Sequence, residues 1–257
     1  MGATVKKYLS AVRYAQISLS LGDTEMSKMP QLEYVVRGLK RSTTTAKHTR
    51  LPITPDILHR LKGVWLTWQN QRDASMLWAA VTMCFCGFLR SGEVVVPSQM
   101  GYDPSSHLSF GDVRVDSTTT PQCIEIRIKS SKTDPFWMGV STYLGRTNNE
   151  LCQVAASLDY MVRRGTGAGP FFSFADGSYL TQDRFVRAVR SALDRIGIVS
   201  SNYAGHSFRI GAATTAAQRG IQDVLIKTLG RWESSAYTLY VKTPRETLCS
   251  VTGALVA

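Results

Sequence analysis

GHSFR, at residues 205–209, is the segment on which the fold assignment depends, because it combines an imidazole with a guanidinium at helical spacing. We expect it to begin a helix that runs from Phe208 to Gln218. His206 and Arg209 lie three residues apart, so on a helix they share one face and can bind the same anion. A lone histidine here would more often be a cap or core residue, and the neighbouring arginine favours an anion site.

A candidate nucleophile follows in a second motif, LGRW at residues 229–232 with Tyr240 after it. Tyr240 lies far enough from Arg209 to belong to another segment and to approach the same anion from a different side. An unassisted phenol has a pKa of about 10 and is a poor nucleophile at neutral pH, so it needs nearby cations or a base. Tyr237 competes for this role, and aromatic packing is the alternative explanation for either ring.

Upstream, Arg90 directly follows the most apolar segment of the chain, a helix that we expect from Ala74 to Leu89. A charge at the end of a buried helix is costly without a partner, and a planar guanidinium suits phosphate oxygens. The alternative is that Arg90 pairs with Glu93, three residues on. The two interpretations are compatible, because Glu93 can hold Arg90 in register for a phosphate.

A lysine completes the set of candidate catalytic groups. Lys132 follows a segment of alternating apolar residues and lies at the expected tip of a hairpin, where a flexible amine can protonate a leaving oxygen. Lys129 is its rival, and a solvated turn lysine is the alternative interpretation of Lys132. No cluster of paired carboxylates suggests a two-metal site, so we expect chemistry that uses neither a metal nor a cofactor.

The composition favours an anionic partner. The chain has 257 residues with 30 Lys and Arg against 19 Asp and Glu, a formal net charge of +11, which makes nucleic acid a reasonable partner. Its 5 cysteines form no CxxC pair, so we expect reduced thiols in an intracellular protein. The longest apolar run, Met76 to Leu89, is shorter than the roughly 20 residues of a membrane span, and the N-terminus lacks the apolar region of a secretory signal.

Hydrophobic periodicity predicts a mainly α fold with a small antiparallel β-sheet, an α+β architecture. Strict alternation of Ile124, Ile126 and Ile128 marks the middle one of three strands, which we expect at 108–115, 123–129 and 136–140. Thr54 and Pro55 form a typical start for the third helix. Helices are expected at 5–20, 30–41, 58–68, 74–89, 150–163, 182–196, 208–218 and 221–229.

A polar, basic run without apolar periodicity, residues 41–50, separates two parts of the chain. It predicts a helical segment at residues 1–42, a linker at 43–50 and a larger domain at 51–257. Neither part contains an internal repeat or a low-complexity tract.

Together these residues resemble the tyrosine recombinase (phage-integrase) family. Its pattern is an arginine in an LRxxE segment, a lysine on a hairpin, an HxxR pair, a histidine or tryptophan just after a glycine, and a tyrosine. The family places this tyrosine ten residues after the glycine, and ten residues after Gly230 is Tyr240 rather than Tyr237. The matching residues here, in the same order, are Leu89-Arg90 with Glu93, Lys132, His206 with Arg209, and Tyr240.

One position departs from the family pattern. Arg231 directly follows Gly230, and Trp232 comes one residue later. We assign the histidine/tryptophan role to Trp232, with Arg231 as a rival phosphate contact. This form of the motif is similar to that of recombinases from eukaryotic mobile elements, the DIRS, Ngaro and Crypton groups.

The resemblance implies the recombinase catalytic fold for residues 51–257 and a reaction that cleaves and rejoins DNA. Tyr240 would attack a phosphate to form a 3′-phosphotyrosyl link, and Lys132 would protonate the 5′ leaving oxygen. The implied partners are double-stranded DNA and a homotetramer on it, with a monomer or weak oligomer in its absence. The nucleus is the expected location if the source is eukaryotic. The phosphate would be held by Arg90, His206, Arg209 and Trp232.

Residues 1–42 resemble only the last helices of the family's helical core-binding domain, so the chain is either truncated or unusually short in this part. Two alternative functions share parts of the resemblance. A type IB topoisomerase uses the same chemistry but reseals the same strand. A domesticated DNA-binding protein would keep the scaffold without cleaving.

Overall fold

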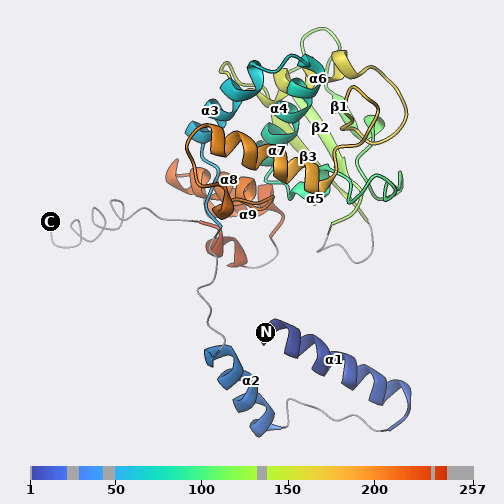
Figure 1. Ribbon diagram of the computed structural model, residues 1–257, viewed down its shortest axis with the longest axis vertical. Helices are drawn as coiled ribbons and strands as arrows, with labels where there is room; N and C mark the ends of the chain where they lie inside the picture. Colours follow the sequence, from blue (N-terminus) through green and yellow to red (C-terminus); the bar gives the residue numbers. More distant parts are fainter. Residues whose placement is uncertain (1, 22–28, 43–49, 132–137, 233–234, 242–257) are drawn as a thin grey trace, which may run out of the picture. The chain divides into compact units, whose positions relative to one another are not determined.

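The computed structural model describes residues 2–21, 29–42, 50–131, 138–232 and 235–241. The chain divides into two compact units, residues 1–49 and 50–257 (Figure 1). In its described part the first unit contains helices α1 (Gly2–Ser18) and α2 (Pro30–Ser42), which pack on each other. Val36 is the one buried apolar side chain that this part contains, so its core is small.

The second unit is built around α4 (Gln71–Cys86), which Figure 1 shows at its centre. The helix is apolar on nearly all sides and its residues from Ala74 to Cys84 are buried except for Trp78, because other elements surround it. The elements packed on it are α3 (Pro55–Leu66), α5 (Ser91–Val94), α6 (Gln153–Arg164) and α8 (Ser207–Gln218); α7 (Gln182–Arg195) packs on α3, and α9 (Asp223–Gly230) on α8.

A three-stranded antiparallel sheet completes this unit, in the order β1 (Val113–Val115), β2 (Cys123–Ile128), β3 (Val140–Gly145). Ile126 is paired with Val113 on one side and with Thr142 on the other. The three isoleucines of β2 are all buried in the main core, as their alternation predicts. The mainly helical fold with a small antiparallel sheet is therefore confirmed.

Two strand predictions need correction. The first strand begins at Val113 rather than at residue 108, because a 3₁₀ turn, η2 (Phe110–Asp112), precedes it and the Asp112 carboxylate accepts the N–H of Ser109 at 2.7 Å. The third strand, expected at 136–140, in fact begins at Val140 and continues to Gly145. Gly139, with φ +68°, breaks the extended conformation just before it, and residues 136 and 137 lie outside the described ranges.

The central helix is also shorter at its C-terminal end than expected. It ends at Cys86 instead of Leu89, and Phe88 adopts a left-handed conformation with φ +51°. Arg90 therefore does not close this helix but is the N-cap residue of the short helix α5. The change of direction at Phe88 separates the apolar helix from the charged segment that follows.

Close backbone approach explains why α8 contains a glycine. A Cβ added to Gly211 would lie 1.8 Å from the carbonyl oxygen of Ile53. The segment before α3 is held against the start of α8 at the same place, because the N–H of Ile53 donates to the carbonyl oxygen of Ser207 at 2.9 Å. The two backbones are too close for any side chain at position 211.

We predict that Gly211→Ala lowers the free energy of unfolding by about 2 kcal/mol or more, because the new methyl group collides with backbone that cannot rotate away. Gly63→Ala is the matched control: Gly63 is inside α3 with no atom near its missing Cβ, and alanine there should raise the stability by about 0.5–1 kcal/mol. Urea unfolding of the two variants measures both values. Equal midpoints for Gly211→Ala and the wild type would contradict the prediction.

Candidate active site

The guanidinium of Arg209 is fully buried, with 0% of the residue exposed. Its Nη1 donates to the carbonyl oxygen of Phe88 at 2.8 Å, and its Nη2 donates to that of Gly230. The ring of Trp232 lies 4.2 Å from its central carbon, in cation–π contact. Arg209 thus joins three separate segments: the loop after α4, helix α8 and the end of α9.

Glu93 lies between two further arginines. Its Oε1 accepts from Nη1 of Arg90 at 2.9 Å, and its Oε2 accepts from Nη2 of Arg231 at 2.7 Å and from the backbone N–H of Arg90 at 2.9 Å. The Glu93 side chain is only 5% exposed, so its carboxylate is committed to these donors. The predicted Arg90–Glu93 pair is present, and Arg231 adds a second guanidinium to the same carboxylate.

These charges act on Arg209. Burial, followed by the positive charges of Arg90 and Arg231, lowers the pKa of Arg209 to about 10. Burial likewise lowers the pKa of Arg231, against the opposing effect of Glu93. Three guanidinium groups and one carboxylate leave a local charge of +2, because 3 − 1 = 2. Repulsion among like charges in a partly buried site favours binding of an anion.

Two tyrosines lie next to Trp232, and their surroundings differ. Tyr240 follows the 3₁₀ helix η4 (Ser235–Leu239), is partly exposed, and has its ring centroid 5.3 Å from that of Trp232. It also lies within electrostatic reach of Arg209, where a phenolate charge would stabilise the guanidinium. Tyr237 is buried and hydrogen-bonds Asp223, which raises the pKa of its phenol. Tyr240 is thus partly exposed and within electrostatic reach of Arg209, whereas the phenol of Tyr237 is engaged with Asp223.

Arg231 and Trp232 have different positions in this cluster. Arg231 adopts a left-handed conformation with φ +53°, which directs the two neighbouring side chains to different partners. Arg231 reaches Glu93, whereas Trp232 folds back over Arg209. Gly230 makes this possible, because a Cβ there would lie 1.7 Å from the Trp232 ring. Both residues therefore belong to the cluster, and they do not compete for one place.

His206 is the exposed N-cap residue of α8, three residues before the buried Arg209. The preceding Gly205 lies against α5, since a Cβ added to it would be 1.9 Å from Oγ of Ser91. Ser91 in turn accepts a hydrogen bond from Nε2 of Gln182 at 2.9 Å. The turn that carries His206 is thus packed against the segment that begins at Arg90.

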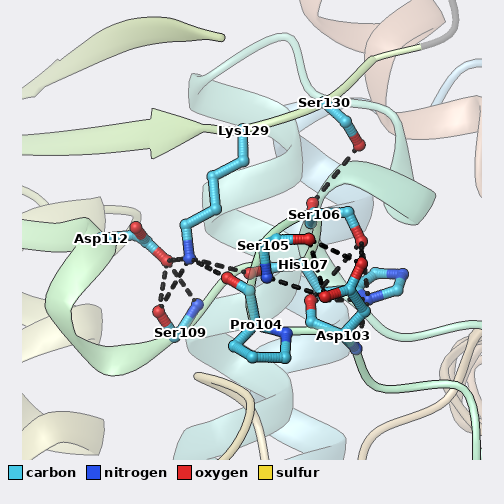
Figure 2. A network of polar contacts seen from close by, with 9 residues as sticks. All are labelled: Asp103, Pro104, Ser105, Ser106, His107, Ser109, Asp112, Lys129 and Ser130. Atoms are coloured by element: carbon cyan, nitrogen blue, oxygen red, sulfur yellow. Dashed lines mark hydrogen bonds and ion pairs between the residues drawn. The ribbon is translucent and has the colours of Figure 1, made fainter. Parts of the chain in front are cut away.

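The structure describes only one of the two candidate lysines, Lys129. Lys132 lies outside the described residues. Lys129 is held by four oxygens: the carboxylate of Asp112 at 2.5 Å and three others, from Pro104 (2.7 Å), Ser109 (3.1 Å) and His107 (3.3 Å) (Figure 2). An ammonium has only three N–H groups, so Lys129 has none left for a substrate.

Sequence reasoning missed the backbone acceptors of Arg209, the carbonyl groups of Phe88 and Gly230. No side-chain pattern marks a carbonyl group, and the only related signal is the glycine at position 230. A cavity of about 280 Å³ between α3, α4 and α6 is lined by none of the predicted site residues. Within the described ranges no group of three or more His, Cys, Asp or Glu side chains could hold a metal ion, and no helix is long and apolar enough to cross a membrane.

Comparisons with known proteins identify the fold. No family model and no curated protein matches the sequence. Among solved structures, the chain is similar to the XerH site-specific recombinase bound to its palindromic difH substrate in a post-cleavage complex, with 14% identity and a TM-score of 0.59 over 82% of this chain and 55% of that one. It is also similar to the XerA recombinase, with 16% identity and a TM-score of 0.58 over 82% of this chain and 65% of that one.

A third similar structure is a lambda integrase dimer bound to a core site, with 15% identity and a TM-score of 0.52 over 79% of this chain and 51% of that one. The chain therefore spans roughly half to two thirds of the length of these proteins and has the fold of their shared tyrosine recombinase structure. The similarity to the DIRS, Ngaro and Crypton groups stays a prediction.

We predict that Glu93→Gln lowers the free energy of unfolding by about 2–3 kcal/mol, because it leaves Arg90 and Arg231 without their shared counter-charge. Combining it with Arg231→Gln removes one of the unpaired charges, so the double variant should lose less than the sum of the two single losses, with a coupling of about 1–2 kcal/mol. Urea unfolding of the four proteins gives the cycle. Additive losses would mean that the ion pair has no energetic role.

Proposed function

We propose that this protein cleaves and rejoins DNA strands through a covalent link between Tyr240 and a 3′ phosphate, as a site-specific recombinase that moves or integrates a mobile element. The observation that carries the proposal is the cluster of Arg90, Arg209 and Arg231 around a single carboxylate, with a partly exposed tyrosine beside it. The recombinase fold of the chain and its net charge of +11 support this proposal.

The charge of the site suits the charge of the reaction. A phosphodiester carries one negative charge, and the pentavalent transition state carries a second. The local excess of +2 is therefore matched to the transition state more closely than to the substrate. Arg209 is held by backbone carbonyls in the protein alone, so it needs little rearrangement when the charge on phosphorus increases.

Each residue then has a role. Arg90, Arg209 and His206 bind the non-bridging oxygens, with Arg231 as a further contact. Glu93 holds Arg90 and Arg231 in place. Trp232 covers Arg209 and supports the ring of Tyr240.

The reaction itself exchanges one phosphoester for another. The Tyr240 phenol releases its proton to solvent, its oxygen attacks phosphorus, and the bond to the 5′ oxygen breaks. The departing 5′ oxygen takes its proton from Lys132, the proposed general acid. A 5′-hydroxyl group of another strand reverses these steps, so the bond energy is kept without ATP.

The proposed partner is double-stranded DNA. Exchange between two duplexes requires four active sites, which leads us to propose a homotetramer on DNA and a monomer or weak oligomer without it. In a eukaryotic source this reaction would take place in the nucleus. We also propose that residues 1–42 contribute to a DNA clamp and that residues 43–50 link it to the catalytic domain.

We predict that the protein forms a covalent adduct with nicked duplex DNA and that Tyr240→Phe abolishes it. A pool of randomised duplexes, each with one nick, removes the need to know the target, because cleavage near the nick releases a short fragment and traps the adduct. Denaturing gels detect the adduct, and sequencing of the bound strands identifies the target. Tyr237→Phe is the matched control and should keep the adduct, since that phenol is bound to Asp223.

An adduct that persists in Tyr240→Phe, or none in the wild type, would contradict the proposal. A wild type that binds duplex DNA without any adduct would be a non-cleaving DNA-binding protein. Once a target is known, exchange of strands between two labelled duplexes separates a recombinase from a topoisomerase, which would only relax supercoiled DNA.

A further inference from the structure

We propose that Lys129 is a positioning residue for the proton-transfer step, because it ties the strand that leads to Lys132 to a rigid turn at residues 103–109. The inference rests on the proposed function, in which Lys132 protonates the 5′ leaving oxygen. Lys129 itself would touch neither DNA nor the reacting atoms.

All three N–H groups of the Lys129 ammonium are engaged by neighbouring oxygens. Its ammonium pairs with the buried carboxylate of Asp112 and donates to two backbone carbonyls and to Oγ of Ser109 (Figure 2). Oδ2 of Asp112 also accepts the N–H and the hydroxyl of Ser109, so the same oxygen holds Lys129 and the start of the 3₁₀ turn. Moving Lys129 would leave a buried carboxylate without its cation, which strongly disfavours any other position.

The turn to which Lys129 is attached, residues 103–109, is held by its own hydrogen bonds. The carboxylate of Asp103 accepts from the N–H of Ser105 at 2.9 Å and from the hydroxyls of Ser105 and Ser106, at 2.7 and 2.8 Å. The backbone N–H of Asp103 donates to Nδ1 of His107 at 2.9 Å, which closes the turn from the other side. Two carbonyl groups of this turn, those of Pro104 and His107, are the ones that accept from Lys129.

Lys129 lies at the end of the paired part of the hairpin formed by β2 and β3. The last residue pair of strands β2 and β3 is Ile128 with Val140, so Lys129 is the first residue beyond the paired strands. The next residue is attached to the same turn, because Oγ of Ser130 donates to the carbonyl oxygen of Ser106 at 3.3 Å. On the returning side, a Cβ at Gly139 would be 3.0 Å from the carbonyl oxygen of Ile128. The described residues on both sides of 132–137 are therefore closely held.

The proposed proton transfer gives a functional reason for holding Lys129 in this way. A proton donor on a hairpin loop works only when its amine reaches the leaving oxygen within hydrogen-bond distance. Fixing the strand three residues before Lys132 limits the space that the amine can explore, and a misplacement of about 1 Å can lower a rate on the order of 100-fold. A lysine needed only for solubility would stay in solvent, whereas the Lys129 side chain is 18% exposed.

The test uses the cleaved target from the nicked-duplex pool in two chemical forms. In one the leaving atom is the normal 5′ oxygen, and in the other it is a 5′ bridging sulfur. A thiolate leaves without being protonated, because thiols are far more acidic than alcohols. Loss of the proton donor, or of its position, should therefore slow cleavage of the oxygen substrate and leave the sulfur substrate nearly unaffected.

We predict that Lys129→Met slows single-turnover cleavage of the oxygen substrate by about 10- to 100-fold, and cleavage of the sulfur substrate by less than about 3-fold. Lys132→Ala should show the same pattern with a larger effect. Asp112→Asn, which weakens the same contacts without touching the hairpin, should lie between Lys129→Met and the wild type. Lys62→Met is the control, because Lys62 is also partly buried beside a carboxylate, that of Glu150, and should leave both rates unchanged.

Thermal unfolding monitored by circular dichroism accompanies each rate. Should Lys129→Met fail to fold, the comparison is made with Asp112→Asn and Lys129→Arg. Equal slowing on both substrates, or no slowing in a folded variant, would overturn the inference while the Tyr240 adduct of the wild type still supported the proposed function. Absence of that adduct would overturn both.

Discussion

The buried guanidinium of Arg209 is the constraint on which the rest of the second unit, residues 50–257, depends. It is held by the carbonyls of Phe88 and Gly230, two residues far from it in the chain, and covered by the ring of Trp232. A buried charge without such partners would be expensive, so each of these segments must adopt the conformation that supplies its contact. The left-handed backbone at Phe88 follows from this requirement, since it turns the chain away from α4 just before the charged segment.

Close contacts around Arg209 also account for the glycines in the motifs. Gly205 lies against Ser91, Gly211 against Ile53 and Gly230 against Trp232, and a Cβ at any of these positions would be less than 2 Å from its neighbour. The first contact joins the turn before α8 to α5, the second joins α8 to the segment before α3, and the third joins the end of α9 to the chain that follows it. The motifs that contain His206, Arg209 and Trp232 are therefore packing motifs, whose glycines let neighbouring segments approach closely.

Several features could be predicted from the sequence because their causes are local. The alternating isoleucines of β2 and the apolar helix α4 are periodic patterns, and the Arg90–Glu93 pair needs only three residues of separation. The features that escaped prediction have tertiary causes. The prediction for the third strand was wrong because its buried residues, Thr142 and Leu144, are recognisable only once the strand is paired with β2. The contacts of Lys129 come from Asp112 and from the turn at residues 103–109. No spacing in the sequence connects these residues to Lys129.

A single carboxylate, that of Glu93, lies among three arginines and affects both the stability and the charge of the site. Burial, and then repulsion from Arg90 and Arg231, lowers the pKa of Arg209, and without Glu93 this repulsion would lose its compensation. The loop that carries Arg90 would also lose its anchor. With a second carboxylate the local charge would fall from +2 to +1, because 3 − 2 = 1. One carboxylate fixes two guanidiniums in position and leaves an excess of positive charge at the site. The site therefore carries more positive than negative charge in the protein alone, and in the function that we propose a phosphodiester would supply the missing negative charge.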